Sequence, residues 1–209
     1  MICEDDKIPG RREAKRQERR AAIVAVAQRH FQEHGYGGVS MSAIAAELGG
    51  SKTTLWTYFA SKEDLFAAAL EEWTVEFGCA DLIPDLGSLH ETLVGYCANF
   101  LRVMLTPGVA TLFRLVIAEG PRFPEIGRIF YEHAPLRRHR TLAGYLERQM
   151  DAGELRRVDS LRASAQLHHL CMYRLFMHSM WGLDPDVSQQ AIVREAEEAV
   201  DMFLRGYGE

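Results

Sequence analysis

The chain has few cysteines, and no two of them form a close pair. Its 209 residues include four, Cys3, Cys79, Cys97 and Cys171, spread along the whole sequence. No C-x-x-C motif is present, and cysteines this far apart do not form the disulfide framework of a small secreted domain. We therefore expect reduced thiols and a cytoplasmic location.

Long apolar runs are also missing. The longest candidate, Ala21–Ala27, is much shorter than the ~20 residues that a membrane-spanning helix requires. The N-terminal residues MICEDDKIPGRR place acids before bases and contain no apolar core, unlike a secretory signal. The sequence therefore predicts no signal peptide and no association with a membrane.

The motifs of common enzyme classes are absent as well. The sequence contains no G-x-S-x-G elbow, P-loop, S-x-x-K motif or G-x-G-x-x-G motif. His30 and His34 stand four residues apart in a helical segment, but no third ligand follows at a spacing that suits zinc. A surface pair near a helix C-terminus is the better interpretation. We expect no enzyme, no metal and no cofactor, although sequence motifs alone leave weak catalysis in a pocket open.

No stretch alternates polar and apolar residues cleanly enough to predict a β-sheet. Apolar residues instead recur at helical spacing, with proline and glycine at the breaks. We predict an all-α fold of about nine helices, with a three-helix N-terminal head and a helical C-terminal body. The helices expected in the body are Leu89–Leu105, Val109–Glu119, Pro124–His133, Pro135–Asp151, Leu161–Trp181 and Val187–Arg205.

The head contains a helix-turn-helix pattern. Ser40 is a good N-cap for a short amphipathic helix, and Gly49 accepts the positive φ that ends it. Ser51 then caps a second short helix, Lys52–Phe59, which Leu55 anchors on its apolar side. Such a second helix is built to enter the major groove of DNA. The alternative is a pair of packed short helices in another kind of all-α protein.

Charge is divided unevenly along the chain. The net charge is −5, but residues 1–62 hold ten Lys and Arg against seven Asp and Glu, a net +3. A dense basic run begins at Arg11 and Arg12 and favours contact with DNA phosphates. The alternative for this run is a solvated helix end, in which Glu13 and Glu18 form local ion pairs.

The stretch around the helix-turn-helix, from about residue 20 to 70, resembles the DNA-binding domain of TetR/AcrR-type bacterial transcriptional regulators. The matching residues are Phe31, Gly35, Tyr36, Ser40, Ile44, Ala45, Leu48, Gly49, Ser51, Lys52, Leu55, Tyr58, Phe59, Ser61, Lys62 and Leu65. Two residues depart from the family's pattern, Thr53 where glycine is usual and Trp56 where tyrosine is usual. A β-branched Thr53 would alter how closely the second helix approaches DNA, which predicts an unusual base preference.

The resemblance and the exposed polar positions together predict the DNA-contacting residues. They are Arg11, Arg12, Ser40, Ser51, Lys52, Thr53, Thr54, Trp56, Thr57, Tyr58 and Lys62. The expected domains are a flexible basic arm at 1–14, a helix-turn-helix domain at 15–78 and a ligand-binding and dimerisation domain at 79–209. In the resembling family, the helix that Ser61 begins links head to body, and its angle sets the spacing of the two heads of a dimer.

The segment from Leu112 to Pro135 resembles the C-terminal domain of AefR-like regulators within this family. That resemblance supports the architecture. We expect the middle helices to enclose a pocket for a small, largely hydrophobic effector, whose identity the sequence does not give. The large side chains expected to line it are Phe100, Met104, Phe113, Ile117, Tyr131, Tyr145, His168, Met172 and Phe176. Each of them could instead be plain core, and a buried, hydrogen-bonded His168 is the simpler expectation.

The last two predicted helices are apolar over more than one face. We expect them to meet their symmetry mates in a four-helix dimer interface, as the resemblance also implies. The residues expected there are Leu170, Arg174, Met177, Trp181, Ile192, Ala196, Val200 and Phe203. The alternative is that both helices complete a monomeric core.

The predicted function is a sequence-specific transcriptional regulator, most simply a repressor that its effector releases from a near-palindromic operator in double-stranded DNA. Dimerisation fits this function, because two heads ~35 Å apart would contact successive turns of the same groove. The alternatives are a helical protein-binding adaptor and a regulator without a small-molecule effector. The positive head against an acidic body argues against the adaptor.

Overall fold

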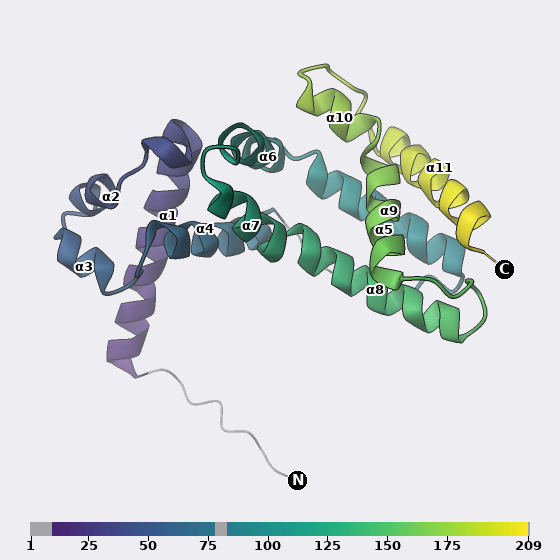
Figure 1. Cartoon of the computed structure of the whole chain (residues 1–209), viewed down its shortest axis with the longest axis horizontal. Helices are drawn as coiled ribbons and strands as arrows, with labels where there is room; N and C mark the ends of the chain where they lie inside the picture. The colour runs from purple at the N-terminus through teal and green to yellow at the C-terminus, as the bar shows by residue number, and fades with distance from the viewer. Residues whose placement is uncertain (1–9, 78–82, 209) are drawn as a thin grey trace, which may run out of the picture. The chain divides into compact units, whose positions relative to one another are not determined.

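The computed structural model describes residues 10–77 and 83–208, and within them the chain is built from helices (Figure 1). No β-strand occurs in these residues, and one isolated bridge joins Leu155 to Gly208. The all-α prediction is therefore confirmed. The chain divides into two compact units, Met1–Glu72 and Trp73–Glu209, so the boundary falls a few residues before the expected one at 78.

The first unit contains helices α1 to α3 and most of α4. They span Arg11–Gly38 (α1), Met41–Glu47 (α2), Lys52–Trp56 (α3) and Lys62–Glu76 (α4). The regular part of α1 ends at Gly35, whose φ of 69° no ordinary helical residue adopts. Phe31 and Tyr36 on either side of this kink pack against Phe66 of α4, with ring centroids 5.2 and 5.3 Å from that of Phe66.

The expected helix-turn-helix is present at α2 and α3. The side chain of Ser40 caps α2 by accepting from the Ala43 N–H at 3.1 Å. Gly49 has a φ of 62° between the two helices, as the glycine turn required. Leu55 is the buried residue of α3, so the short helix is held by one apolar anchor and leaves its other side chains exposed.

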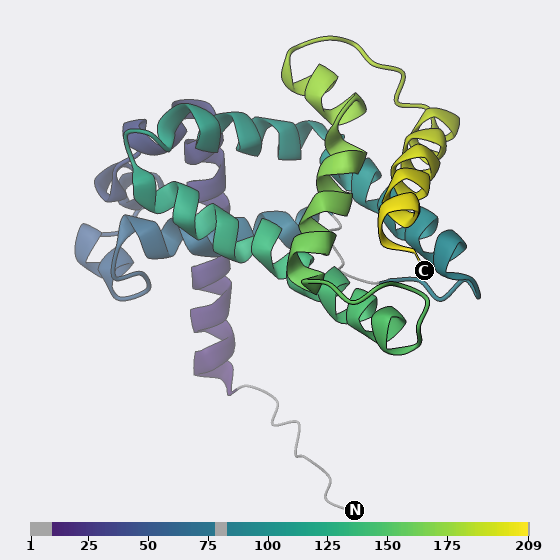
Figure 2. The same ribbon diagram turned by 45° about the vertical axis from the view of Figure 1, so that its right-hand side comes forward.

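Helices α5 to α11 form the second unit, which we call the body (Figure 2). Their bounds are Leu89–Met104 (α5), Pro107–Glu119 (α6), Pro124–His133 (α7), Pro135–Asp151 (α8), Ser160–Met172 (α9), Leu175–Met180 (α10) and Gln189–Tyr207 (α11). Helix α5 packs most extensively against α11, and α8 against α9. One continuous apolar core runs between these four helices, which include the buried residues Leu101, Leu146, Leu167 and Val200.

The single helix predicted at Leu161–Trp181 is wrong, because the structure divides it into α9 and α10. The break falls at Tyr173 and Arg174, and Arg174 has a φ of −105° and a ψ of −72°. The guanidinium of Arg174 pairs with the buried carboxylate of Glu195 on α11. Apolar residues continue on both sides of the break, so periodicity gave no sign of it.

No single helix in residues 10–77 and 83–208 is long and apolar enough to cross a membrane. Helices α5 and α6 pass such a test together by length and composition, but they are bent by 71° relative to each other. The apolar residues of α5 lie in the core of the body.

Candidate DNA-binding surface and effector cavity

The exposed side of α3 presents polar and aromatic side chains and no acid. Lys52, Thr53 and Trp56 all face solvent there. Ser51 caps the helix by accepting from the Thr54 N–H at 3.1 Å, which fixes the start of α3. A surface of this composition can approach phosphates and base edges without charge repulsion.

Two threonines of the predicted surface use their hydroxyls within the motif. The Thr54 hydroxyl lies 2.9 Å from that of Ser51, and the Thr57 hydroxyl donates to the Thr54 carbonyl at 2.7 Å. Their methyl groups are the parts left for contact with DNA. Apolar contact with the thymine methyl is one of the ways in which side chains distinguish bases. Tyr58 beside them is half-buried.

Lys62 is held by the head itself. Its ammonium donates to the carbonyls of Tyr36 at 2.7 Å and Val39 at 3.0 Å, and lies 4.1 Å from the centre of the Tyr36 ring. These carbonyls follow the kink at Gly35, where the helical hydrogen-bond pattern is interrupted. Lys62 therefore ties the start of α4 to the segment between α1 and α2, a role that sequence patterns did not reveal.

The basic run lies on α1. Arg11 and Arg12 open the helix and are exposed, so residues 11–14, expected in a flexible arm, are helical. Gly10 precedes them, and the rest of the expected arm, 1–9, lies outside the described residues. Further along, Arg19 donates to the Leu48 carbonyl at 3.1 Å, and the Arg20 guanidinium lies 5.1 Å from the centre of the Phe59 ring. Part of the run thus supports the helix-turn-helix, while its first residues remain at the surface.

A small polar cluster joins α1 to α2 on the surface of the head. Arg29 and His30 of α1 both contact the carboxylate of Glu47, His30 through Nε2 at 2.6 Å. His34 lies next to His30, with ring centroids 5.6 Å apart. No group of three His, Cys, Asp or Glu residues suited to a metal occurs in the described part of the chain. The role of Glu47 was missed, because it lies 17 residues from His30 in the sequence.

The body contains a partly open cavity of about 100 Å³ lined by residues of α5, α6, α8 and α9. Five of the predicted pocket residues line it, namely Phe100, Met104, Phe113, His168 and Met172. Four lining residues were not predicted, namely Pro135, Arg138, His139 and His169. Three of these four belong to the first turns of α8, which reads in the sequence as a polar, solvent-facing segment.

His168 is the most buried polar residue of the cavity wall, with 2% of its surface exposed. Its Nε2 lies 2.9 Å from the Tyr96 hydroxyl, and its Nδ1 is fully buried. Burial lowers the pKa of His168 well below its usual value, and the nearby His139 and Arg138 act in the same direction. The pKa of His139 is also lowered, first by burial and then by His169 and Arg138. Both rings are therefore favoured in the neutral form.

Four predicted pocket residues lie elsewhere. Ile117 is 64% exposed and Tyr131 is 49% exposed, so each points away from the core. Tyr145 is half-buried on α8, and burial raises its pKa. Phe176 is buried behind Phe113, with ring centroids 5.1 Å apart, and so supports the wall without lining the cavity.

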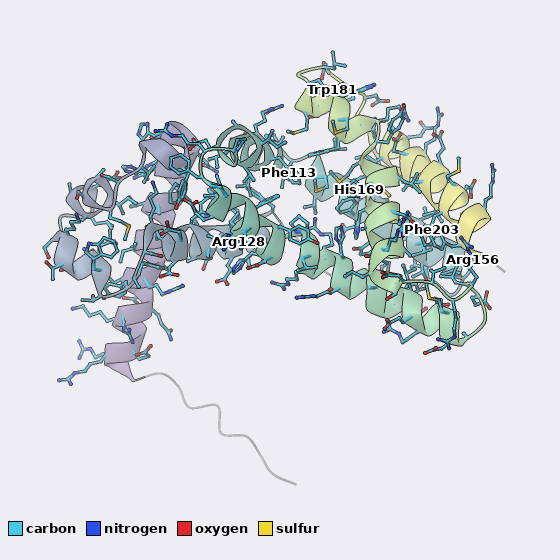
Figure 3. The ribbon with its side chains drawn as sticks, in the orientation of Figure 1. Phe113, Arg128, Arg156, His169, Trp181 and Phe203 are labelled. Carbon is cyan, nitrogen blue, oxygen red and sulfur yellow. The ribbon has the colours of Figure 1, made fainter. Side chains whose placement is uncertain are left out.

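The predicted dimer residues fall into two groups. Four on α11 are buried within the body itself and cannot meet a partner in this state, namely Ile192, Ala196, Val200 and Phe203. Their amphipathic face packs on α5 and α9. The other four lie on α9, α10 or their junctions. Leu170, Arg174 and Trp181 are exposed, and Met177 is half-buried. Figure 3 shows Trp181 at the end of α10.

Two family models match the chain. A model of the C-terminal domain of AefR-like transcriptional repressors matches residues 91–209. A model of bacterial regulatory proteins of the tetR family matches residues 23–69, which include α2 and α3. The two matches fall in the body and in the head respectively.

Individual relatives agree with these matches. An uncharacterized HTH-type transcriptional regulator of Mycobacterium tuberculosis is 28% identical over 138 residues, 66% of this chain and 65% of that protein. The match thus spans just under two thirds of that relative's length. The DNA-binding transcriptional repressor TetR of Mycobacteroides abscessus is 35% identical over 81 residues, 39% of this chain and 42% of that protein.

Solved structures share the whole fold. The flavonoid-responsive regulator FrrA is 30% identical, with a TM-score of 0.82, and the match covers 92% of this chain and 98% of that one. A TetR-family regulator from Mesorhizobium loti is 24% identical, with a TM-score of 0.77 and the same two coverages, and supports the fold alone.

Proposed function

Because this chain belongs to the TetR family of bacterial transcriptional regulators, we propose that it represses transcription by binding a near-palindromic operator as a homodimer. A small, largely apolar effector would release it from that DNA. The operator lies on the bacterial chromosome, so we expect the protein to act in the cytoplasm.

The observation that carries this proposal is the geometry of α2, Gly49 and α3. A capped five-residue helix follows a positive-φ glycine and is anchored by Leu55 alone. Its exposed side offers Lys52 and Trp56 for contact with the major groove. The exposed Arg11 and Arg12 at the start of α1 are suited to phosphates, which position a protein on DNA without specifying sequence.

A homodimer would double this small contact surface. One α3 offers few side chains, whereas two of them one helical turn apart would bind DNA specifically. The surface that favours self-association lies at the end of α9 and around α10. Its exposed apolar residues are Leu170, Tyr173, Trp181, Leu183 and Val187. Large apolar groups exposed together in this way are typical of protein interfaces.

The cavity between α5, α6, α8 and α9 is the place that suits an effector. Its aromatic and methionine side chains suit an apolar molecule, and few polar groups accompany them. The name of the structural relative FrrA describes that regulator as responsive to flavonoids. We extend to this chain only the coarser expectation of a small, mainly aromatic effector.

Effector binding would act through α4. This helix begins in the first unit and continues past the boundary at Glu72 into the second. An effector can change DNA affinity only if it binds the two conformations of the protein unequally. We therefore expect the effector to favour a conformation in which α4 holds the two heads away from groove spacing.

Salt dependence tests DNA binding against the rival function of a protein-binding adaptor. The affinity of the full chain for plain duplex DNA should fall steeply and linearly on a log–log scale as salt rises, because phosphate contacts release counterions. A Lys52→Gln variant should reduce sequence preference, and Lys15→Gln on α1 serves as a control outside α3. Absence of any salt-dependent DNA binding by folded protein would refute the proposal.

A further inference from the structure

The polar side chains that line the cavity are one arginine and three histidines. Arg138 and His139 come from α8, and His168 and His169 from α9. The described lining residues include no carboxylate and no amide side chain. The remaining wall is apolar, with Phe100, Met104, Phe113, Pro135 and Met172. A purely hydrocarbon ligand would gain nothing from four such nitrogen-bearing side chains.

The basic groups lie close to one another. The rings of His139 and His168 have centroids 5.0 Å apart, and the Arg138 guanidinium lies 5.2 Å from the centre of the Phe100 ring. Phe100 in turn packs on His168, with ring centroids 4.6 Å apart. Arg138 and His168 therefore both lie against Phe100, and His139 lies against His168.

His168 is held in the cavity wall by its own chain. Its Nε2 lies 2.9 Å from the Tyr96 hydroxyl, and the Ser164 carbonyl acts on the ring as a backbone hydrogen-bond partner. Its Nδ1 is fully buried, so the hydrogen bonds offered to a ligand would come from Arg138 and His139.

The lowered pKa values of both histidines have the same physical origin. Besides burial, His168 is affected by His139, Arg138 and His169, and His139 by His169 and Arg138, all in the direction that disfavours a further positive charge. The Ser164 carbonyl acts on His168 in the opposite direction. Burial, the larger cause, disfavours a charge of either sign, whereas the permanently charged Arg138 guanidinium would favour an anion. The first turn of α8, at Pro135, adds the positive end of a helix dipole to the wall.

We infer that the cavity binds a small aromatic or aliphatic acid, whose carboxylate lies against Arg138, His139 and His168 while its apolar body lies among Phe113, Met104 and Met172. This assignment deepens the proposed function, because it names the chemical class of the effector. A carboxylate is the best match for arginine, whose planar fork donates two parallel hydrogen bonds. The ring would pack against the aromatic wall.

The cavity size limits what binds without rearrangement. An engineered cavity of roughly 150 Å³ accepts benzene, so a space of about 100 Å³ admits even benzoate only if part of the wall moves. A larger acid would require a larger movement. Met172 is the last residue of α9, next to the break at Tyr173 and Arg174. This is the part of the wall where the helix is interrupted, so we expect the movement there.

Benzoate and benzamide are matched probes for the carboxylate. They have the same ring and nearly the same shape, and differ in charge. Titrated into the full chain at about pH 6.5 and followed by ligand-observed NMR, benzoate should bind about tenfold more tightly than benzamide, as expected for charge-assisted hydrogen bonds. Arg138→Gln should remove most of this preference. Arg140→Gln, an exposed arginine on the same helix that does not line the cavity, should leave it unchanged.

A pH series adds a readout that simple loss of fold would not mimic. Benzoate beside His139 and His168 would raise the pKa of both rings, so binding would take up protons. The groups that face these rings are Arg138, His169 and the Tyr96 hydroxyl, and none of them is a carboxylate. Benzoate affinity should therefore fall as the pH rises from about 6 to 8, and benzamide affinity should not.

The outcomes separate this inference from the proposed function. Equal affinities for benzoate and benzamide, or no binding of either at tens of millimolar, would overturn the assignment of an acid. DNA binding is measured independently on the same preparation. A benzoate preference without any duplex binding would support the acid-binding cavity and contradict the proposed DNA-binding function. Duplex binding without a benzoate preference would support the DNA-binding function and contradict the acid-binding cavity.

Discussion

At the scale of single residues, Lys62 shows how one side chain acquires a role that its position in a motif does not reveal. The family resemblance indicates a phosphate contact, while the structure gives the ammonium two carbonyl partners, of Tyr36 and Val39. Hydrogen bonds to a charged group contribute about 1.5–3 kcal/mol when partly buried. The residue therefore stabilises the head whether or not it also contacts DNA.

Replacing Lys62 distinguishes these roles. Lys62→Ala should lower the free energy of unfolding by about 1–3 kcal/mol and weaken binding to every duplex, because the helix-turn-helix loses its tie to α1. Denaturant unfolding and duplex titrations measure the two effects. A variant that keeps full stability but loses DNA affinity would show that the phosphate contact is the only role. Arg140→Ala, which removes an exposed basic side chain of the body, is the control.

His168 makes stability depend on pH. Its pKa in the folded chain is lowered below the value near 6.5 that it has when unfolded. Below about pH 6.5 the unfolded chain therefore binds a proton that the folded chain excludes, and stability falls as the pH falls. Above that pH both states are neutral, and the effect is absent. His139, which is half-buried beside His168, has a lowered pKa too and contributes in the same direction.

The measurement is the free energy of unfolding at pH 7.5 and at pH 5.5. Wild type should lose stability over this interval, by at most about 1.4 kcal/mol per pH unit from each histidine. His168→Gln should lose less, since the amide does not titrate, and carboxylates common to both proteins cancel in the comparison. An identical pH dependence in the two proteins would contradict the buried neutral histidine.

At the scale of elements, the glycine turn between α2 and α3 is, with Gly35, one of two places in the described part of the head where a glycine has a positive φ. Gly49 has a φ of 62°, and a Cβ added there would meet nothing within 4 Å. The cost of a side chain is therefore the left-handed backbone itself, about 1 kcal/mol for alanine. Gly49→Ala should lower head stability by about that amount and weaken DNA binding through the altered angle of α3.

Gly144→Ala provides the matched comparison. Gly144 lies inside α8 with ordinary helical geometry, and an added Cβ again meets nothing within 4 Å. Alanine should stabilise this helix by up to about 1 kcal/mol. Thermal unfolding of both variants measures the contrast. A Gly49→Ala protein as stable as wild type would show that the turn does not require glycine.

Local signals explain which elements the sequence predicted well. Ser40, Ser51 and Ser61 were expected to start helices, and each accepts a hydrogen bond from the N–H three residues later. These features depend on neighbouring residues alone. The break between α9 and α10 depends on Arg174 meeting Glu195 of α11, 21 residues away, and no local pattern contained it.

The cavity was half predicted for a related reason. Large apolar residues of α5, α6 and α9 indicated an enclosed space. Arg138 and His139 did not, since charged residues at a helix start usually face solvent. Helix α8 packs against α9, and this contact turns its first polar turns toward His168. Tertiary packing therefore decided which polar residues line the cavity.

At the scale of the whole molecule, burial decides which apolar residues are available for the proposed dimer. An amphipathic helix does not reveal whether its apolar face meets its own chain or a partner. In α11 the apolar face is turned inward, and Phe203 is 1% exposed. Tyr173, at 78%, and Trp181, at 66%, are large aromatic residues around α10 that are exposed enough to meet another copy.

Two aspartate substitutions test that position. Trp181→Asp should yield a folded monomer, because it places a charge in the exposed apolar surface around α10. Phe203→Asp should unfold the body, since it buries an unpaired charge in the core. Light scattering and circular dichroism measure the two outcomes. A fully dimeric Trp181→Asp protein would place the interface elsewhere.

The central claim is that two such chains bind one operator through α3. Selection of high-affinity duplexes from a random-sequence library, with the full chain at about physiological salt, tests it most directly. We expect one near-palindromic sequence to be enriched, with half-sites about one helical turn apart, to which the Trp181→Asp protein binds weakly. If folded, dimeric protein enriched no sequence at all, the claim that this chain is a sequence-specific regulator would be contradicted.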